Sequence, residues 1–574
     1  QIAGPLSGTY TVGLTAMREL LGKDLRYEPR TRKVKVMVPD ESYVERPIVS
    51  KDPNKKEETS ISHISKDALN RPLKEVEIEE TYYELTENGS KYTGPNYASY
   101  KNASRKGSTN GNPTDLIGAY TTITAALSDL NNLGVSGPVT FVLIDNGSYV
   151  GETYPLQFNS TISGVSAVNT VTLKPQTGIA STIPGNINAN ATIRILSNYV
   201  TIDGSNSGGT DRSLTIQNTS VTTPSVVLVG STGTTPITNV MIKNCTITNG
   251  VNSSSAVVVS DATALGSPGY FNTVTVQNCL LEKSYNAIFV NGGTTTPNGQ
   301  NLFVYSNSIN STGTNAVAFT GVAVQGCNTG IISQNTIANF DGTADQDDKG
   351  IWIAQGCSNF TVERNNISAL NYTGTGGYGG HGMYITTVLA NANITVKNNM
   401  IYNLSGDGWS YTSVPTDNPI GIAVGSATAS TQSGINIYNN SIYLSGNTLN
   451  QTGALSVGVF IGNGATGIDL RNNAIVNNLG LLGATGTGSS CVYLFTAASQ
   501  LTTASYNCYY SNATGSGTKN IGNIVSAFQT TIAGWRTASG KEALSFNSLP
   551  LFTSATDLHI QTSDLTLNGR GTYI

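Results

Sequence analysis

NVMIKNCTITN (residues 239–249) is the stretch that decides the fold, because variants of it return along the chain. Each copy is a short strand of alternating apolar and polar residues, then an Asn-rich step, then a second short strand. The later copies are TVTVQNCLLEK (273–283), NLFVYSNSINS (301–311), TGIISQNTIAN (329–339), NFTVERNNISA (359–369), NITVKNNMIYN (393–403), GINIYNNSIYL (434–444), GIDLRNNAIVN (467–477) and LTTASYNCYYS (501–511). A unit that returns every 20–50 residues or so, without a helical period, predicts an all-β solenoid, the right-handed parallel β-helix.

The Asn-rich step predicts a polar column along the axis of the solenoid. In each copy, the residue two places before the first apolar residue after the step is Asn or Cys: Cys245, Cys279, Asn307, Asn335, Asn365, Asn399, Asn440, Asn473 and Cys508. Stacked coils place such positions about 4.8 Å apart, so each Asn can bond to the Asn above and below. Asn also tolerates the left-handed backbone of a sharp corner, and the small Cys fits the same column. We interpret the nine residues as a structural ladder rather than as ligands.

Composition excludes several classes of function. The formal charge of −4 gives no basic footprint for nucleic acid, and no apolar run reaches the roughly 18 residues of a transmembrane helix. No phosphate loop, zinc spacing or Ser-His-Asp order is present, so no cofactor is expected. Gln1 resembles a mature N-terminus left after removal of a signal peptide.

The six cysteines are too few for a disulfide scaffold in 574 residues. Cys245 and Cys279 share one column, and Cys327 and Cys357 share another. Stacking brings their Cα atoms within disulfide range, but side chains on one face of neighbouring coils point the same way. We therefore expect reduced thiols, with disulfides as the alternative.

The charge distribution predicts an inserted module. Residues 14–107 hold 18 of the 31 Lys and Arg residues and 16 of the 35 Asp and Glu residues. We assign residues 1–13 to the first strand of the β-helix, 14–114 to a small charged α+β module, and 138–574 to the β-helix proper. A partly disordered extension is the alternative for the charged segment.

Three stretches suggest structure in and after this module. MRELLGKDL (17–25) favours a short helix, whereas KVKVMV (33–38) and KEVEIEETYYEL (74–85) alternate like half-exposed strands. DLIGAYTTITAALSDLNNLG (115–134) has apolar residues at helical spacing and ends on a glycine. We expect an amphipathic helix over 115–137 that covers the open end of the solenoid.

GPLSGTYTVG (4–13), AYTTITAALSDLNNLGVSGPVTFVL (119–143) and SFNSLPLFTSATDLHIQ (545–561), taken with the repeats, carry a family resemblance. Together they resemble large secreted β-helix proteins of Bacteroidetes and their relatives. In that family the first two stretches are nearly continuous, and here the charged module separates them. The resemblance implies export by the type IX pathway to the cell surface, and it says little about activity.

The sharpest catalytic candidates are Asp347, Asp348 and His381. DDKGIWI and GHGMYI begin equivalent strands in successive coils, and polygalacturonase-type glycosidases carry similar DD and GHG motifs. Paired carboxylates can act as a general acid and as the base that activates water. The chain departs from that family at Asn328-Thr329-Gly330, where the third residue would be Asp, and only Lys397 lies near the expected Arg-Ile-Lys motif.

Two further hypotheses concern the binding of Ca²⁺ and of sugars. The carboxylates of Asp341, Asp345, Asp347 and Asp348 offer oxygen ligands for Ca²⁺, although their spacing matches no calcium loop and a solvated acidic loop is favoured. Five rings form a candidate sugar-stacking groove, with plain packing as the alternative: Trp352, Tyr378, His381, Tyr384 and Trp409.

The sequence favours an extracellular structural protein without enzymatic activity. A long repetitive body with stackable ends and a module of both charges predicts association with further copies of itself, as a fibre, sheath or surface layer. The strands at 33–38 and 74–85 can add to a sheet edge of a neighbouring copy, or the module can cap its own rod. The alternatives are an adhesin that binds surface polysaccharide and a polygalacturonase-like hydrolase.

Overall fold

The computed structural model describes residues 5–12, 25–39, 73–87, 90–91, 116–120 and 122–574, without 295–296, 484–485 and 516. The chain divides into two compact units. The smaller is Thr15–Asn102, and the larger combines Gln1–Leu14 with Ala103–Ile574. The larger unit is an all-β parallel β-helix of about 12 turns with very few helices, which confirms the fold prediction.

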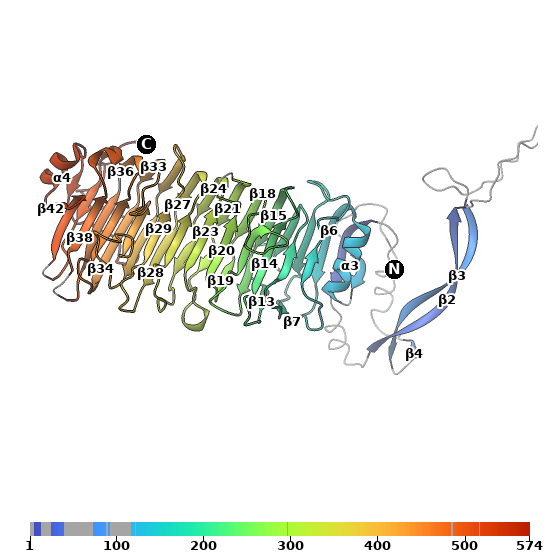
Figure 1. Cartoon of the computed structure of the whole chain (residues 1–574). Coiled ribbons are helices and arrows are strands. Elements are labelled where there is room, and N and C mark those ends of the chain that lie inside the picture. The colour runs from blue at the N-terminus through green and yellow to red at the C-terminus, as the bar shows by residue number, and fades with distance from the viewer. Residues whose placement is uncertain are drawn as a thin grey trace, which may run out of the picture. The chain divides into compact units, whose positions relative to one another are not determined.

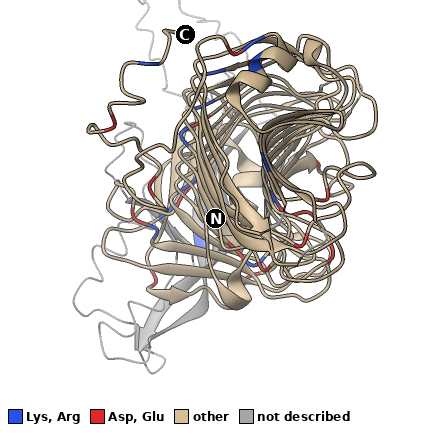
Figure 2. Ribbon diagram, turned by 90° about the vertical axis from the view of Figure 1, so that its left-hand side faces the viewer, with Lys and Arg blue, Asp and Glu red and all other residues tan. Residues whose placement is uncertain are grey.

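Within the described residues, three sheets of 14, 13 and 13 strands enclose the core of the larger unit (Figures 1 and 2). Their strands are parallel, except for β42 (Ala527–Gln529), which pairs antiparallel with β41 (Thr518–Ile524). Each coil gives one strand to each sheet, as β24 (Cys327–Ser333), β25 (Thr336–Ala338) and β26 (Lys349–Ile353) show. We call the three sheets the first, second and third, in that order. Successive coils pair in register, so identical positions form columns.

A glycine column sets the distance between the third and second sheets. Gly321, Gly350, Gly382, Gly421 and Gly458 face the core opposite a column of isoleucines on the second sheet. A Cβ atom on Gly382 would lie 2.5 Å from the Gly421 carbonyl oxygen and 2.5 Å from Cγ2 of Ile401. The two sheets therefore approach too closely for any side chain at this position.

The Asn ladder is a continuous hydrogen-bonded column between the first and second sheets. The side-chain oxygen of Asn399 accepts from the backbone N and Nδ2 of Asn365, at 2.9 and 3.0 Å. Its Nδ2 donates to Oδ1 of Asn440 at 2.9 Å and to the Val362 carbonyl at 2.9 Å. The same pattern repeats from Asn307 to Asn473, and the Cys279 backbone N donates to Asn307 at the start.

The last ladder position corrects the sequence alignment. Asn507, rather than Cys508, accepts from Asn473 at 3.0 Å, and Cys508 lies one position further on. The Nδ2 of Asn507 donates to Glu542, a fully buried carboxylate that also accepts from Tyr509 and Ser545. The column therefore ends on a buried carboxyl group, whose pKa burial raises.

The residues with a left-handed backbone at this corner are also not the ones predicted. The positive φ angles belong to the residue before each ladder position, for example 56° at Asn398 and 55° at Asn439. The ladder residues themselves point inward from the next position. All six cysteines, which lie within the described residues, are buried free thiols.

Strands as well as a helix close the N-terminal end of the larger unit. β1 (Leu6–Val12) lies between β5 (Leu116–Tyr120) and β6 (Val135–Leu143) in the first sheet. The expected helix over 115–137 is therefore too long: α3 spans Ile123–Leu133, and residues 116–120 are a strand. Thr122 caps α3, and the Glu152 carboxylate accepts from two first-turn backbone amides, which offsets the positive end of the helix.

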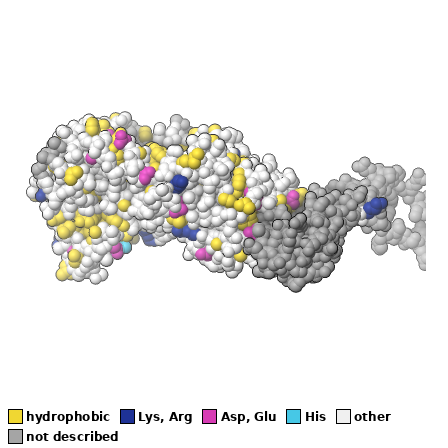
Figure 3. Space-filling view, turned by 90° about the horizontal axis from the view of Figure 1, so that it is seen from below, with side chains coloured by type: hydrophobic (Ala, Val, Ile, Leu, Met, Phe, Trp, Pro, Cys, Tyr) yellow, Lys and Arg dark blue, Asp and Glu magenta, His cyan; other side chains and the backbone are white. Residues whose placement is uncertain are grey.

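The C-terminal end carries a second helix that the sequence analysis did not predict. α4 (Ile532–Ser539) packs against β41 (Thr518–Ile524), and its fully buried Trp535 lies over Gly522. Among the described residues, no helix is long and apolar enough to cross a membrane. On the face of the larger unit seen in Figure 3, charged side chains are few and widely spaced.

The smaller unit contains an antiparallel ribbon. β2 (Leu25–Pro39) pairs with β3 (Leu73–Glu87) along 15 positions, and β4 (Ser90–Lys91) adds a short third strand. These strands include the two predicted from alternation. The helix expected over 17–25 lies outside the described residues, apart from Leu25, which begins β2.

Candidate functional site

The site lies where three loops enter the third sheet. Asp347 and Asp348 directly precede β26, and His381 begins β29 (His381–Ile385). Asp417 lies in the loop before β32 (Ile420–Val424). Because these strands pair in register, with Lys349 beside His381 and His381 beside Ile420, the three loop ends meet over neighbouring coils.

Asp347 and Asp417 form a hydrogen-bonded carboxyl pair. Burial raises the pKa of Asp347 well above its usual range, the Lys349 ammonium opposes the rise, and the Asp417 carboxyl adds to it. Burial likewise raises the pKa of Asp417, while its bond to Asp347 opposes the rise. Two carboxylates in contact cannot both ionise cheaply, so burial and contact together favour a proton shared within the pair. Both side chains are half-buried and reach the surface.

Lys349 is a buried cation beside this pair, with 7 % of its surface exposed. Its Nζ lies 4.5 Å from the ring centroid of Phe319 and 5.6 Å from those of Trp352 and Tyr384. It also donates to the Asp347 carbonyl oxygen. Burial lowers the pKa of Lys349, and the neighbouring carboxylates oppose this. The rings and carboxylates together hold the ammonium in place of water.

Asp348 lies behind the pair, away from solvent. It is 2 % exposed, and its Oδ1 accepts from Nε2 of Gln346 at 3.1 Å. Burial raises the pKa of Asp348 to about 8. Asp348 is therefore a protonated structural group at neutral pH.

His381 is buried as well. Its Nε2 lies 2.6 Å from the Thr416 carbonyl oxygen, which fixes the proton on that nitrogen. Burial and the nearby Lys349 lower the pKa of His381 to about 3, so the ring is neutral. Nδ1 has no partner among the described residues. His381 positions the loop of Asp417 and does not reach the surface.

A row of half-buried rings borders the carboxyl pair. Tyr285 stacks on Phe319 at 4.6 Å between centroids, Phe319 meets Trp352 edge-on at 6.4 Å, and Trp352 stacks on Tyr384 at 6.1 Å. We call these four residues the aromatic row. It crosses successive coils along the outside of the third sheet. Burial, with the nearby Asp347, raises the pKa of Tyr384 to about 12.

The other two predicted rings belong to the loops. Tyr378 packs edge-on against Tyr372 at 5.4 Å, and Trp409, which is 39 % exposed, lies against Gly377. These contacts hold the loops together, because Asp407 also accepts from the backbone N of Gly377 and of Tyr378. Of the predicted groove, only Trp352 and Tyr384 therefore lie in the aromatic row, with His381 behind Tyr384.

The remaining parts of the polygalacturonase-like pattern lie elsewhere. Asn328, Thr329 and Gly330 are in β24, and Lys397 ends β30 (Ile394–Lys397), both in the first sheet. Lys397 forms an ion pair with Glu363 at 3.4 Å. The motif residues are therefore divided between two sheets.

The carboxylates considered for Ca²⁺ diverge. Asp341 accepts from Nδ2 of Asn252 at 3.2 Å, Asp345 accepts from the Tyr372 hydroxyl, and Asp348 accepts from Gln346. The described residues contain no group of three or more His, Cys, Asp or Glu side chains arranged to hold a metal ion.

Sequence reasoning missed Lys349 and Asp417. Lys349 stands next to the DD motif, but nothing in the sequence shows that it is buried among rings. Asp417 lies in the longest interval between ladder residues, from Asn399 to Asn440 (440 − 399 = 41 residues). A long loop inserted in one coil was the available signal for this site.

Comparison with known proteins gives no family. No family model matches the chain, and no curated protein matches it in sequence. In structure the chain is similar to the Dettilon tailspike protein, with 11 % identity and a TM-score of 0.39, over 70 % of this chain and 65 % of the tailspike. It is also similar to the A-module of the Azotobacter vinelandii mannuronan C-5 epimerase AlgE6, with 13 % identity and a TM-score of 0.34, over 75 % of this chain and 94 % of the module. The likeness spans less than two thirds of the tailspike and concerns the fold alone.

Proposed function

We propose that the protein binds polysaccharide outside the cell, through the aromatic row and the Asp347–Asp417 pair. The observation that carries this proposal is the surface-reaching carboxyl pair beside a row of stacked rings. Ring faces offer apolar surfaces to the C–H faces of sugars, and carboxyl oxygens accept from sugar hydroxyls. The row crosses several coils, so it suits an extended chain rather than a single small molecule.

The geometry favours binding over hydrolysis. Glycosidases separate their two carboxyl groups by roughly 5–9.5 Å so that a sugar or a water fits between them. Asp347 and Asp417 instead interact directly with each other, which argues against a sugar or a water held between them. His381 and Asp348, the other residues of the hydrolase reading, are buried.

Charge narrows the class of sugar. The carboxyl groups of Asp347, Asp348 and Asp417 surround the ammonium of Lys349, and Asp341 lies near Asp348. Even with protons on Asp347 and Asp348 the surroundings stay negative. A polyuronate would be repelled, so we infer a neutral polysaccharide.

Isothermal titration calorimetry against xylan, mannan, galactan and glucan oligosaccharides, with oligogalacturonate as the acidic counterpart, tests this function. At least one neutral glycan should bind, and Trp352→Ala should weaken it at least tenfold. Trp409→Ala is the matched control, because it removes an exposed indole from a neighbouring loop. Asp417→Asn should also weaken binding without changing the melting temperature greatly. Release of reducing ends that disappears in Asp347→Asn would replace binding with hydrolysis, and equal effects of both tryptophan variants would overturn the site.

Self-association is a second candidate, favoured by the register of the ribbon. In the backbone register of the ribbon, position 32 (Arg) lies opposite position 80 (Glu), 33 (Lys) opposite 79 (Glu) and 35 (Lys) opposite 77 (Glu). Within the described residues β2 has one partner strand, and its other edge is free for strand addition by a further copy. Electron microscopy and sedimentation of the full chain, beside a chain lacking Thr15–Asn102, test whether the ribbon connects one copy to the next. Filaments from the full chain alone support the ribbon as connector, and a full chain that stays monomeric at high concentration refutes it.

A further inference from the structure

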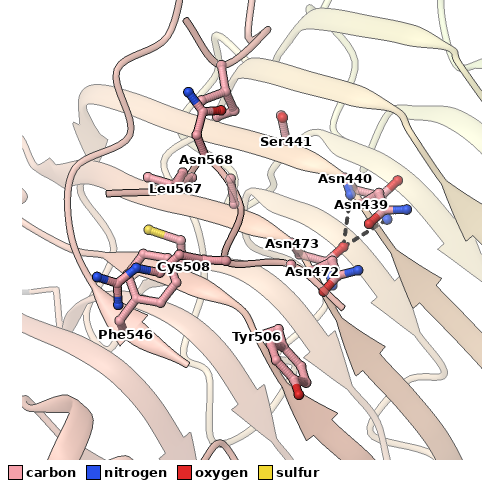
Figure 4. A pocket seen from close by; sticks show the side chains of 14 residues that line it. Asn439, Asn440, Ser441, Asn472, Asn473, Tyr506, Cys508, Phe546, Leu567 and Asn568 are labelled. Atoms are coloured by element: carbon pink, nitrogen blue, oxygen red, sulfur yellow. Dashed lines mark hydrogen bonds between the residues drawn. The ribbon is translucent and has the colours of Figure 1, made fainter. Parts of the chain in front are cut away.

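A second concave site lies at another corner of the larger unit, between coil turns and the C-terminal segment (Figure 4). The cavity measures about 260 Å³. One wall consists of turns that join the first sheet to the second, around Asn439 and Asn472. The other wall is the segment 560–571, which Asn472 holds by two bonds to the Thr572 backbone, of 2.7 and 2.9 Å.

The lining combines apolar faces with unused polar groups. Phe546, Tyr506 and Leu567 supply apolar surface. Ladder bonds occupy the Asn440 and Asn473 side chains, drawn as dashed lines in Figure 4. The Asn439 side chain and the Ser441 hydroxyl, by contrast, have no hydrogen-bond partner within the described part of the chain.

Arg570 gives the cavity its charge. Its guanidinium lies over the Phe546 ring, 5.3 Å from the centroid. The ion pairs found among the described residues are Lys243–Asp203, Lys397–Glu363, Arg471–Asp469 and His559–Asp557, so none of them uses Arg570. The fourteen lining residues include no Asp or Glu. A planar guanidinium without a carboxylate partner suits a carboxylate or a sulfate group.

We propose that this cavity binds one acidic sugar residue, with its carboxylate or sulfate on Arg570 and its hydroxyls on Asn439 and Ser441. Phe546 supports the guanidinium from one side, and Tyr506 and Leu567 contact the sugar ring. The volume is near the lower end of the roughly 300–1,000 Å³ typical of small-molecule sites, which suits a monosaccharide unit. This site has the opposite charge preference to the aromatic row and does not depend on it.

Calorimetric titration with three disaccharides tests the proposal: digalacturonate, a sulfated galactobiose and neutral galactobiose. One or both acidic probes should bind at least tenfold more tightly than the neutral one, and the two arms show which anionic group is preferred. Arg570→Gln should remove at least tenfold of that affinity. Asn439→Asp, which adds a negative charge at a turn position that Asp tolerates, should do the same.

Arg364→Gln is the matched control. Arg364 is exposed and occupies the same turn column two coils before Asn439. Trp352→Ala should likewise leave the acidic probes unaffected, which separates this site from the aromatic row. Failure of both acidic probes to bind, equal binding of the neutral probe, or equal losses in Arg364→Gln and Arg570→Gln would each overturn the proposal.

Discussion

The Asn ladder and the Asp347–Asp417 site both stack polar groups across coils, but they are built in opposite ways. In the ladder every residue meets the same neighbour above and below, and each amide oxygen accepts two bonds from the preceding coil. In the site each coil contributes a different residue from a loop of different length. Repetition makes the ladder saturated and neutral, whereas irregular loops leave the site with shared protons and a buried cation.

This difference shows which parts of a solenoid stabilise the fold and which parts can bind a ligand. A column in which every donor and acceptor is already used is a poor binding site, because a ligand would have to break bonds that already exist. Loops can differ between coils without disturbing the columns, so they carry groups that a ligand can reach.

The largest expected effect comes from breaking the ladder. Asn399→Leu removes the oxygen that Asn365 N and Nδ2 use, and it orphans the Val362 carbonyl. At about 1–3 kcal/mol for each unsatisfied buried group, we expect a loss of about 3–5 kcal/mol in the free energy of unfolding. Urea denaturation measures it. Asn398→Gly, at the exposed left-handed neighbour, is the control, and equal losses would show that the ladder bonds do not matter.

Gly382→Ala tests the contact between the two regions, because Gly382 follows His381 and faces Ile401 behind the ladder. The new methyl group would overlap Ile401 and the Gly421 carbonyl. Overpacking of this kind should cost about 1–3 kcal/mol. Gly209 lies in an exposed loop, where a Cβ atom would meet only the Ser207 hydroxyl, at 3.2 Å, and that side chain can move aside; Gly209→Ala should cost much less in the same denaturation series. A stable Gly382→Ala would show that the sheets can separate without cost.

A smaller, pH-dependent effect should appear at Asp348. The folded carboxyl keeps its proton up to about pH 8, whereas the unfolded one loses it near pH 4, at roughly 3.9. The folded state therefore binds more protons between these values, and this carboxyl lowers stability as pH rises through them. Asp348→Asn should equal wild type in stability at pH 3 and become progressively more stable than wild type as the pH rises toward 8. A difference that stays constant across pH would contradict the raised pKa.

The smallest effect is expected at Lys397, the residue that sequence comparison placed near a catalytic motif. It lies in the first sheet, half-exposed and paired with Glu363. Lys397→Met should change the free energy of unfolding by less than about 0.5 kcal/mol, as exposed pairs do. Glycan affinity should stay within twofold of wild type. A large loss of affinity would mean that the binding surface extends to the first sheet.

The repeat was enough to predict the β-helix and most of the ladder, because columns require the same residue type at the same place in each coil. The prediction failed at Cys508 because the alignment took Tyr510, rather than Tyr509, as the first apolar residue after the step. Tyr509 is the fully buried core residue of that coil, and its hydroxyl bonds to Glu542. The strand at 116–120 was also missed, because its pairing with residues 9–12 crosses the whole inserted module.

The candidate site was predictable only in part. Asp347 stands in a visible motif, but its partner Asp417 is 70 residues away (417 − 347 = 70), in a loop with no repeated pattern. That Lys349 is buried among three rings depends on the shapes of several loops at once. Such contacts do not repeat from coil to coil, so a repeating sequence pattern cannot predict them.

The direction of the ladder bonds has an electrostatic consequence. In each ladder amide the oxygen accepts from the preceding coil and one N–H donates to the next coil, while the other N–H returns to a carbonyl of the preceding coil. The amides therefore all share one orientation along the column, and the components of their dipoles along it add as in a helix. The positive pole meets the buried Glu542, whose carboxyl group accepts the last bond of the column, while burial raises its pKa. The rod therefore has a direction rather than being a symmetric stack, and a coil inserted in the reverse orientation would oppose the field of all the others.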